Sequence, residues 1–472
     1  MEILHVSAEC YPVAKAGGLA DVVGALPKYQ QSLGHTAKVV MPMHRTKFLY
    51  NNEWEVVHKG SFRMGEMYLD FTIIKEKTNK LGFDLYCVDI YGLLDRERIY
   101  SYDDDTERFT AFQIAVTEWL SKWEHHPNVV HVHDHHTALI PFMMQYCFGY
   151  RHLSRIPTVL TIHNAQYQGW MGWDKATYLP AWDTWRWGLL DWSNTVNPLA
   201  CGIKCADKVN TVSPGYMEEL KREANGLESL FNFESGKCTG ILNGIDYSVW
   251  DPATDTYILD NFTVKDLKHG KGLNKKKLCD DLGFDMQYPL IIFIGRLVHE
   301  KAADLLAEAI SKAFEQTGHA FSCMILGSGE KEVENGLQRI QNDFIGYYHS
   351  QIEYNEKLSH QMYAGADFIL MPSRVEPCGL NQMYAMRYGT VPVVRRTGGL
   401  KDTVIDFGEE NGYGICFEKA SVEDIVYSIT RAVELYKDKT KLDEIRQRMM
   451  NINNSWETSA GKYIELYDSI YK

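Results

Sequence analysis

The sequence contains no uninterrupted apolar run of the about 20 residues that a membrane-spanning helix requires. Its 10 cysteines are scattered singly, and Cys201 and Cys205 have the spacing of one helix face and not of a Cys-x-x-Cys clip. Residues 1–9 lead directly into a short apolar strand and lack the basic segment and cleavage site of a secretory leader. These absences predict a cytoplasmic protein with reduced thiols and no membrane partner.

An excess of basic residues is also missing. The chain carries 49 Lys and Arg against 62 Asp and Glu, a net charge of −13, which argues against a nucleic-acid partner. The lysine-rich run at residues 265–277 is interspersed with Asn, Gly and Asp, and we interpret it as a solvated linker and helix start. With 36 Gly and 14 Pro among 472 residues, collagen-like and low-complexity classes are excluded.

Neither of the common glycine-rich phosphate motifs occurs, because the chain has no G-x-x-x-x-G-K and no G-x-G-x-x-G. Instead, a cation, a paired glycine, an apolar residue and an Asp recur in the same order at residues 15–23 and 396–404. Paired glycines at a helix start let backbone N–H groups approach an anion, although a tight turn that binds nothing is the alternative. Two copies predict two α/β halves with a ligand held between them.

The length and the strand pattern also predict two domains, since a single core stops growing at roughly 250–300 residues. Short apolar runs alternate with helical patterns, which is typical of parallel α/β sheets. We place the domains at residues 1–250 and 251–455, followed by an amphipathic helix over 456–472. The expected strands are 2–7, 36–41, 84–89, 129–133, 158–162, 208–211, 290–294, 321–326, 343–347, 368–371 and 391–394. The expected helices include 103–123, 302–314, 358–364 and 382–388.

Charged residues follow two of the expected strands in the second half. Arg296 and Lys301 flank the turn after strand 290–294, where a guanidinium and an ammonium together suit a diphosphate; a surface ion pair is the alternative. Glu376 follows strand 368–371 in an elbow that contains Gly379. An acid beside a helix start suits sugar hydroxyls and a ring that gains positive charge, whereas a simple helix-capping carboxylate is the alternative.

Histidines and tryptophans mark the first half. The run His131-Val-His133-Asp134-His135-His136 resembles a metallo-hydrolase motif, but its Asp falls one place too early. We therefore favour Asp134 as a hydrogen-bonding residue at a pocket edge and predict no metal site. His163 also follows a strand directly. The Trp-rich segment at residues 169–197 forms either satellite core or a platform for sugar rings, and we favour packing.

Taken together, these motifs resemble the bacterial glycogen synthases and the related plant starch synthases over nearly the whole chain. The matching residues are Lys15–Asp21, His133-Asp134, His163-Asn164, Thr211–Pro214, Asn243–Asp246, Gly295–Leu297 with Lys301, Glu376–Leu380 and Arg395–Leu400. The resemblance implies the GT-B fold, in which two Rossmann-like doubly wound parallel-sheet domains face a central cleft. It also implies that the last helix crosses back to the first domain.

The resemblance further implies a retaining transfer of glucose from ADP-glucose to the non-reducing end of an α-1,4-glucan, without a metal or other cofactor. Arg296 and Lys301 would hold the diphosphate, and Lys15 with Gly17 and Gly18 would approach it from the other domain. Asp21 would be a further substrate-binding residue. The glucose would be surrounded by His163, Asn243, Glu376, Cys378 and Gly379, with Asp134 near the reacting groups, and Leu380 would be a further substrate-binding residue. UDP-glucose as donor, or a small acceptor, is the alternative within the fold.

Two residues depart from the pattern of the family. Ala302 stands where the family usually has Gly, and its methyl group is expected beside the phosphates; Asn381 replaces a common Thr. The segment 43–47 also differs, which leaves the acceptor side less defined. Three competing hypotheses are a sucrose- or trehalose-phosphate type transferase, a metal-dependent hydrolase built on the His run, and a silent glycan-binding protein that uses the Trp-rich segment.

Overall fold

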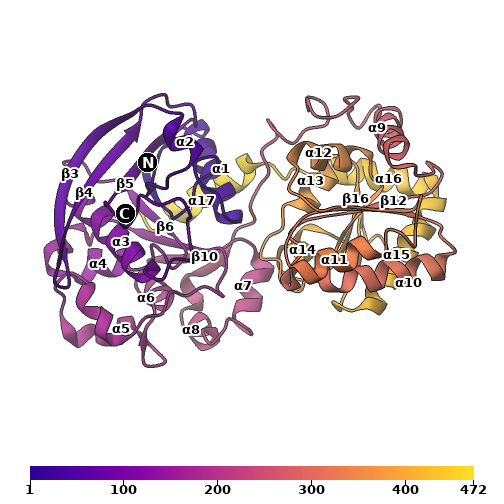
Figure 1. The fold of residues 1–472 in the computed structure, drawn as a ribbon. Helices are drawn as coiled ribbons and strands as arrows, with labels where there is room; N and C mark the ends of the chain where they lie inside the picture. The colour runs from indigo at the N-terminus through magenta and orange to yellow at the C-terminus, as the bar shows by residue number, and fades with distance from the viewer. Residues whose placement is uncertain (472) are drawn as a thin grey trace. The chain divides into compact units, whose positions relative to one another are not determined.

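The computed structural model describes residues 1–471, and the chain folds as two compact units (Figure 1). Unit 1 comprises Met1–Asn243 together with the chain from Trp456 onward, and unit 2 comprises Gly244–Ser455. The first division thus falls a few residues before the expected boundary at residue 250. Within residues 1–471, no helix combines the length and the apolar character that crossing a bilayer requires.

Unit 1 is built on a nine-stranded sheet with the order β11-β10-β7-β6-β1-β2-β5-β4-β3. All neighbouring pairs are parallel except β3–β4 and β4–β5. The strands are β1 (Glu2–Val6), β2 (Thr36–Pro42), β3 (Trp54–Met64), β4 (Met67–Glu76), β5 (Asp84–Asp89), β6 (Val129–His133), β7 (Thr158–Ile162), β10 (Lys208–Thr211) and β11 (Cys238–Gly240), with a separate small pair β8 (Asp191–Trp192) and β9 (Thr195–Val196).

The hairpin of β3 and β4 is a feature that the sequence analysis missed. Gly65, with φ of +61°, turns the chain between the two strands. Much of β3 is exposed, including Val56 and Val57, so this strand lacks the continuous apolar run that marks the buried parallel strands.

The helices of unit 1 are α1 (Gly18–Ser32), α2 (Lys47–Tyr50), α3 (Asp105–Leu120), α4 (Ile140–Tyr146), α5 (Trp187–Leu190), α6 (Pro198–Cys205), α7 (Pro214–Leu220), α8 (Glu228–Phe233) and α17 (Trp456–Asp468). Although α17 is the last helix of the chain, it packs with α1 against the sheet (Figure 1). Its Tyr463 and Tyr467 are fully buried in the cluster that contains Ile3, Val22 and Val129. The C-terminal helix is therefore part of the core of unit 1.

Unit 2 has a six-stranded, fully parallel sheet with the order β14-β13-β12-β15-β16-β17 and helices on both faces (Figure 1). Its strands are β12 (Leu290–Ile294), β13 (Ser322–Leu326), β14 (Tyr348–Gln351), β15 (Phe368–Met371), β16 (Val391–Arg395) and β17 (Ile415–Phe417). Its helices are α9 (Leu267–Leu282), α10 (Leu306–Thr317), α11 (Lys331–Arg339), α12 (Glu356–Gly365), α13 (Asn381–Arg387), α14 (Gly398–Thr403), α15 (Val422–Lys437) and α16 (Lys439–Met450).

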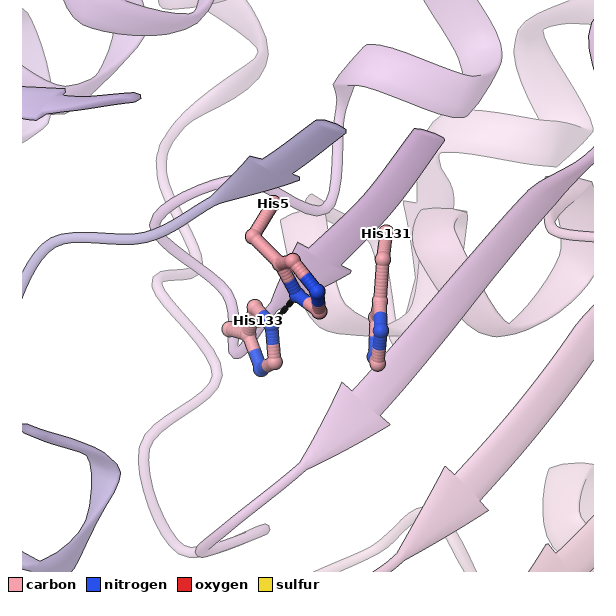
Figure 2. Close-up of side chains that lie close together, drawn as sticks. All are labelled: His5, His131 and His133. Carbon is pink, nitrogen blue, oxygen red and sulfur yellow. Dashed lines mark hydrogen bonds between the residues drawn. The ribbon is translucent and has the colours of Figure 1, made fainter. Parts of the chain in front are cut away.

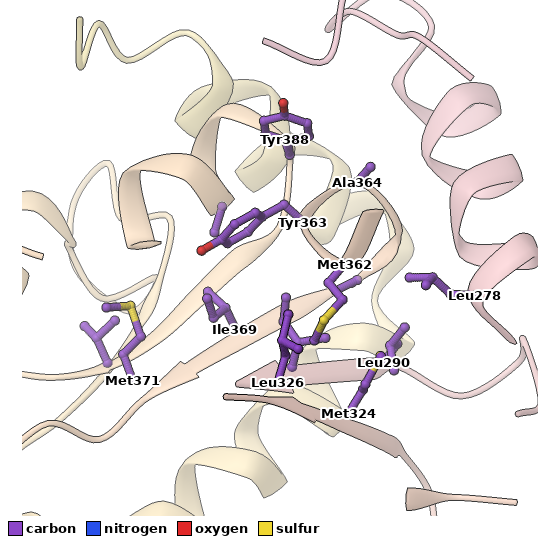
Figure 3. Close-up of a cluster of buried hydrophobic side chains, with 14 of the residues drawn as sticks. Leu278, Leu290, Met324, Leu326, Met362, Tyr363, Ala364, Ile369, Met371 and Tyr388 are labelled. Carbon is purple, nitrogen blue, oxygen red and sulfur yellow. The ribbon is translucent and has the colours of Figure 1, made fainter. Parts of the chain in front are cut away.

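One core cluster fills the space between this sheet and the helices α9 and α12 (Figure 3). Leu290, Met324 and Ile369 contribute from the strands, and Leu278 and Met362 contribute from the helices. All five are at most 5% exposed, so this layer gains the full hydrophobic contribution of its side chains. The apolar strands predicted from the sequence form the centre of the layer.

Two expected elements of unit 2 are wrong in position. The strand expected at 343–347 is a turn containing Gly346 at φ +84°, and β14 begins only at Tyr348. The helix expected from residue 302 begins at Leu306, because Ala302 has a left-handed φ of +54° and ends the preceding short turn His299–Lys301. A left-handed residue cannot continue a right-handed helix.

The lysine-rich run at 265–277 contains the expected helix start, but the expectation of a solvated linker is wrong for two of its lysines. It lies largely in α9, where Lys271 and Lys275 are only 4% and 6% exposed. The Lys271 ammonium donates to the carbonyl oxygens of Tyr363, Ala364 and Tyr388 at 2.9–3.1 Å and lies 2.8 Å from Thr390 Oγ1. Burial lowers the pKa of Lys271, while these oxygens favour its charged form. These lysines are thus structural core residues.

Candidate active site

The strand order of each sheet defines where a ligand can bind. In unit 1 the connections run from β1 outward to β2 on one side and return to β6 on the other, so the loops after β1 and β6 diverge. In unit 2 the loops after β12 and β15 diverge in the same way. In open parallel sheets the crevice between such loops, at the carboxyl ends of the strands, is where ligands bind. The predicted site residues are concentrated in these four loops and in those following the adjacent strands.

The loop after β1 carries the first glycine pair, and its N–H groups already have an anion. The Glu9 carboxylate accepts hydrogen bonds from the backbone N–H groups of Ala16 at 2.5 Å and Gly17 at 2.9 Å. Its other oxygen accepts from the Tyr100 hydroxyl at 2.6 Å. Burial raises the pKa of Glu9, and these three hydrogen bonds oppose the increase. The N–H groups of Ala16 and Gly17 are therefore not unpaired groups available to a phosphate, because they already donate to Glu9.

Glu9 is a site residue that sequence reasoning missed, because a buried carboxylate beside a glycine loop has no spacing signature. It holds the loop in place at the start of α1. A Cβ atom added at Gly17 or Gly18 would meet no atom within 4 Å, so the space beside both glycines is open. A ligand can therefore approach this backbone closely.

Lys15 and Asp21 form an ion pair beside this loop. The Lys15 Nζ lies 2.7 Å from Asp21 Oδ1, and the two side chains are 40% and 27% exposed. Burial raises the pKa of Asp21, whereas the neighbouring Lys15 lowers it. A half-exposed pair in water contributes little to stability, so the Lys15 charge can be redirected toward an incoming anion at small cost.

Asp134 and His163, from the ends of β6 and β7, are brought together. Asp134 has a left-handed φ of +57°, and its Oδ1 accepts a hydrogen bond from the His163 backbone N–H at 2.7 Å. Burial raises the pKa of Asp134 to about 7, opposed by hydrogen bonds from the N–H groups of His163 and Asn164. A carboxyl group with such a pKa can donate or accept a proton near neutrality.

The His run does not converge on one metal. His135 and His136 lie beyond the strand, and the His136 ring is packed between Tyr100 and Phe109, with ring centroids 4.8 and 4.5 Å away. His131 and His133 instead point into the core, where they meet His5 of β1; ligand nitrogens of these three residues lie within 4.8 Å of one another (Figure 2). The grouping with His5 was not visible in the sequence, because β1 and β6 are far apart in the chain.

In unit 2, Lys301 and Glu376 meet across the diverging loops after β12 and β15. The Lys301 Nζ lies 2.7 Å from both carboxylate oxygens of Glu376, and the Ser373 hydroxyl donates to one of them at 2.8 Å. The two side chains are 20% and 10% exposed. Arg296 does not join this cluster: its side chain is 64% exposed and lies 3.3 Å from Glu300.

The elbow that presents Glu376 is supported by the second glycine pair. The Gly399 N–H donates to the Glu376 carbonyl at 3.0 Å, and a Cβ atom at Gly398 or Gly399 would collide with the carbonyl oxygens of Glu376 and Cys378. This pair thus allows close packing of two backbone segments, which agrees with the alternative of a tight turn. Gly379, at φ +75°, turns the chain into α13.

The remaining predicted residues have distinct environments. Cys378 is buried, and Leu380 immediately precedes α13. Asn381 donates from its side chain to the Ile294 carbonyl at 2.7 Å, so it ties α13 to β12. Ala302 is fully buried, which contradicts the expected position of its methyl group beside the phosphates. Asn243 is buried at the end of unit 1, and its Oδ1 has no hydrogen-bond partner within residues 1–471.

The Trp-rich segment is more exposed than expected. Trp185 is 90% exposed, Trp170 59% and Trp187 57%. Trp182 packs edge-on against Phe142, and Trp173 donates its indole N–H to Asp191 at 3.0 Å. The preference for packing is therefore wrong for three of the six tryptophans.

Two mainly parallel sheets, each carrying polar loops at the point where its strand order reverses, define a two-domain glycosyltransferase of the GT-B fold. Residues 2–233 match the family described as starch synthase catalytic domain, and residues 274–449 match the glycosyl transferases group 1.

The full-length relatives are more specific. A glycogen synthase of Flavobacterium johnsoniae is 52% identical over 470 residues, covering 100% of this chain and 99% of the relative. A glycogen synthase of a Hydrogenobaculum species is 37% identical, covering 99% of this chain and 98% of its own. The chain belongs to the glycogen synthase family and is a glycosyltransferase that transfers a glucosyl residue to a glucan.

Solved structures agree with this assignment. The catalytic domain of starch synthase IV from Arabidopsis thaliana, bound to ADP and acarbose, has a TM-score of 0.88 and 31% identity, covering 99% of each chain. Sucrose-phosphate synthase from Thermosynechococcus elongatus, with a TM-score of 0.64, 16% identity and coverage of 100% and 99%, shares the fold.

Proposed function

We propose that the chain transfers glucose from ADP-glucose to the non-reducing end of an α-1,4-glucan with retention of the anomeric configuration. The relatives named glycogen synthase, and the 31% identical starch synthase structure that holds ADP and acarbose, support this donor and this type of acceptor. The single observation that carries the proposal is the pairing of Lys301 with Glu376 where the strand order of unit 2 reverses.

Lys301 and Glu376 can each form a further hydrogen bond, so the pair can bind two groups of one substrate. An ammonium has three donors, and two of those of Lys301 are directed at Glu376; within residues 1–471 the third has no partner. It is available for a phosphate oxygen. The Glu376 oxygens accept three hydrogen bonds in total, which leaves an acceptor position for a sugar hydroxyl.

In the proposed reaction, the bond between the glucose anomeric carbon and the diphosphate oxygen breaks, the acceptor hydroxyl oxygen bonds to that carbon, and the hydroxyl proton passes to the departing diphosphate. Lys301, with the exposed Arg296, stabilises the negative charge that develops on the departing ADP. Glu376 stabilises the positive charge that develops on the sugar ring. Cys378, Gly379 and Leu380 of the same elbow contribute backbone groups around the sugar.

Unit 1 supplies the second set of groups. Lys15 adds positive charge toward the diphosphate, beside the open glycines Gly17 and Gly18. Asp134 and His163 lie near the transferred glucose, where the Asp134 carboxyl, with its pKa of about 7, can exchange a proton at neutral pH. Asn243 contributes its unpartnered Oδ1 as an acceptor for a sugar hydroxyl.

The donor is tested by incubating the purified chain and glycogen with ADP-glucose or UDP-glucose and measuring the nucleotide released. We expect release of ADP with incorporation of glucose into glycogen, at a kcat/KM at least about tenfold above that with UDP-glucose. A preference for UDP-glucose would contradict the proposed donor. Binding of glycogen without nucleotide release would favour a silent glycan-binding protein.

The role of Lys301 is tested by Lys301→Ala, with Lys312→Ala as control. Lys312 lies on α10 and is 52% exposed, so its loss should leave both activity and folding unchanged. Loss of Lys301 removes charge stabilisation of the leaving diphosphate and should lower kcat by about 10² to 10³. Circular dichroism should show that both variants fold. Near-normal turnover of Lys301→Ala would remove this residue from the proposed site.

We also propose that transfer needs no metal ion, because the cations Lys15, Arg296 and Lys301 are sufficient to meet the diphosphate charge. Activity should then survive excess EDTA, and its loss with recovery on addition of Mg²⁺ would contradict the proposal. We further propose a cytoplasmic location with no nucleic-acid or membrane partner. The ten free cysteines and the net charge of −13 support it, and fractionation of cells with an antibody tests it.

A further inference from the structure

The three histidines in the core of unit 1 belong to a larger hydrogen-bonded network. His5 of β1 lies opposite His131 in the parallel register of β1 and β6, and His133 follows on the same face (Figure 2). All three side chains are completely buried. Most buried polar atoms have a hydrogen-bond partner, so the partners of these rings show what the network does.

The first branch leads from helix α1 to the candidate site. Gln30 Oε1 lies 2.8 Å from His5 Nε2, and His5 Nδ1 lies 3.1 Å from His133 Nε2. His133 Nδ1 in turn lies 3.1 Å from His163 Nε2. A continuous line of three imidazole–imidazole and imidazole–amide contacts therefore ends at a residue of the proposed active site.

The second branch leads from helix α17 into the sheet. The Tyr467 hydroxyl lies 2.7 Å from His131 Nδ1, and His131 Nε2 lies 2.6 Å from the Thr161 hydroxyl. Thr161 donates to Asn210 Oδ1 at 2.6 Å, and the Asn210 amide donates to the Tyr463 hydroxyl at 3.1 Å. The two branches are joined, because the Gln30 amide donates to the Tyr467 hydroxyl at 3.1 Å.

The side-chain amides of Gln30 and Asn210 determine which atom donates and which accepts in each hydrogen bond of the second branch. Because Gln30 donates its N–H to Tyr467, the phenol is free to donate its own proton to His131 Nδ1. His131 then carries its proton on Nε2 and donates to Thr161, whose hydroxyl donates to Asn210 Oδ1. The orientation of the Asn210 amide thus agrees with that of the Gln30 amide at the other end of the branch.

The same direction follows along the first branch. Gln30 presents its oxygen to His5, so His5 carries its proton on Nε2 and accepts at Nδ1. His133 must then donate from Nε2 and accept at Nδ1, and the proton between His133 and His163 belongs to His163 Nε2. Burial lowers the pKa of His5 to about 4 and that of His163 to about 3, and lowers those of His131 and His133 as well. All four rings are therefore neutral, with one donor and one acceptor each.

A metal ion is the competing occupant of this cluster, since three histidine nitrogens lie within 4.8 Å. Both nitrogens of His5, His131 and His133 already have hydrogen-bond partners. The acceptor lone pair of each ring points at a specific donor, so a metal would have to break these contacts. The arrangement is that of a hydrogen-bond relay and not of a preformed ligand set.

We propose that Tyr467 of α17 determines the tautomer of His163 through Gln30, His5 and His133. The relay holds the proton of His163 on Nε2 and leaves Nδ1 as an acceptor for a hydroxyl group of the sugar substrate. Tyr467, Gln30, His5 and His133 are positioning residues in this scheme. The tautomer follows from the network alone, whereas its consequence for sugar transfer rests on the proposed function.

The tautomer is measured by long-range ¹H–¹⁵N NMR on the full-length, deuterated protein labelled with ¹⁵N-histidine. The His163→Asn variant assigns the signals of that ring. We expect a neutral Nε2–H tautomer for His163, and the same for His5, His131 and His133. An Nδ1–H tautomer or an even mixture at His163 would overturn the proposal, whether or not the protein proves to be a glucosyltransferase.

Tyr467→Phe tests the source of the ordering, and Tyr463→Phe is the matched control on the same helix. Both remove one buried hydroxyl, so both should lose a similar, modest amount of stability. Only Tyr467 joins the branches, so only its loss lets the Gln30 amide reverse and gives a mixed tautomer at His163. We expect kcat to fall about tenfold in Tyr467→Phe with KM for glycogen unchanged, and less than twofold in Tyr463→Phe.

Three results would contradict the relay. One is an unchanged His163 tautomer in Tyr467→Phe, and another is an equal loss of kcat in both variants. The third is a response to Zn²⁺: stoichiometric binding with joint shifts of the His5, His131 and His133 nitrogens would replace the relay with a metal site. If the tautomers are as expected but no sugar is transferred, the relay stands and the proposed function fails.

Discussion

Acidification from about pH 7 to about pH 5 should destabilise unit 1 through its buried histidines, and His44 allows the effect to be isolated. His44 follows β2 and is 2% exposed. Its Nε2–H donates to the Ala8 carbonyl at 2.9 Å, and its Nδ1 is buried with no hydrogen-bond partner within residues 1–471. Protonation would therefore place a second, charged N–H in the core without an acceptor.

The sign and size of the effect follow from the shift in pKa. Burial, with the nearby Arg108 guanidinium, lowers the pKa of His44 from 6.5 to about 4, whereas its hydrogen bond to Ala8 raises it. Between these values the unfolded chain binds the proton and the folded protein does not, so stability is present above pH 6.5 and is lost as the pH falls. From about pH 7 to about pH 5 the loss is about 2 kcal/mol for this one residue.

Other groups in unit 1 contribute with both signs. Burial lowers the pKa of His5, His131 and His136 as well, and each adds to the acid loss. Asp134 acts in the opposite direction, because its pKa is raised to about 7 and protonation in this interval stabilises the folded state. The comparison of one variant with the parent at two pH values cancels these shared contributions.

The experiment compares the parent with His44→Gln, whose amide can still donate to the Ala8 carbonyl. Hydrogen exchange followed by mass spectrometry measures the free energy of opening of β1 and β2 at both pH values. The variant should be less stable at pH 7, and the difference should shrink by about 2 kcal/mol at pH 5. His125→Gln, at an exposed position, is the control and should show no such change. A difference that stays constant or widens would refute burial as the cause.

Three further predictions concern unit 2 and the aromatic surface. Gly399→Ala forces the Cys378 carbonyl away and should lower kcat about 10²-fold and the free energy of unfolding by about 1–3 kcal/mol. The control Gly272→Ala on α9 has open space around it and should stabilise the protein by about 1 kcal/mol. Normal activity of Gly399→Ala would contradict the role of this glycine in supporting the Glu376 elbow. Lys271→Met leaves three buried carbonyls without their donor and should lower the free energy of unfolding, measured with denaturant, by about 3 kcal/mol. The control Lys276→Met, at an exposed position, should lower it by less than about 0.5 kcal/mol. If Lys271→Met were more stable than the parent, burial of the ammonium would be the larger cost. Trp185→Ala should change the free energy of unfolding by less than about 0.5 kcal/mol, because Trp185 is 90% exposed. A loss above about 1 kcal/mol would show that the ring is packed in solution.

Residues that follow a buried strand were predictable from the sequence. Lys301, Glu376, Asp134 and His163 each stand just beyond an apolar run, and parallel strands bring their carboxyl ends to one edge of a sheet. Residues without such a marker were not predictable. Glu9 is an example, because its function depends on a carboxylate reaching the N–H groups of Ala16 and Gly17.

The two paired-glycine motifs also show which properties are local and which depend on tertiary contacts. The two copies have almost the same letters, and local conformational freedom is all that the letters specify. What lies beside each pair is decided by other segments: open space beside Gly17 and Gly18, and the Glu376–Cys378 backbone beside Gly398 and Gly399. The same motif therefore lies beside open space in one unit and against packed backbone in the other, because tertiary contacts differ.

The class of fold, most of the parallel strands and the strand-end residues of the site were predictable from the amino acids alone, because hydrophobic periodicity and the residues next to a strand are local properties. The pairing of charges, the burial of lysines and the contacts among histidines depend instead on how distant segments pack together. His5 and His131 are more than a hundred residues apart and become neighbours through the register of β1 and β6. Tyr467 reaches the same network because the last helix packs on the first, and no local pattern encodes such a contact.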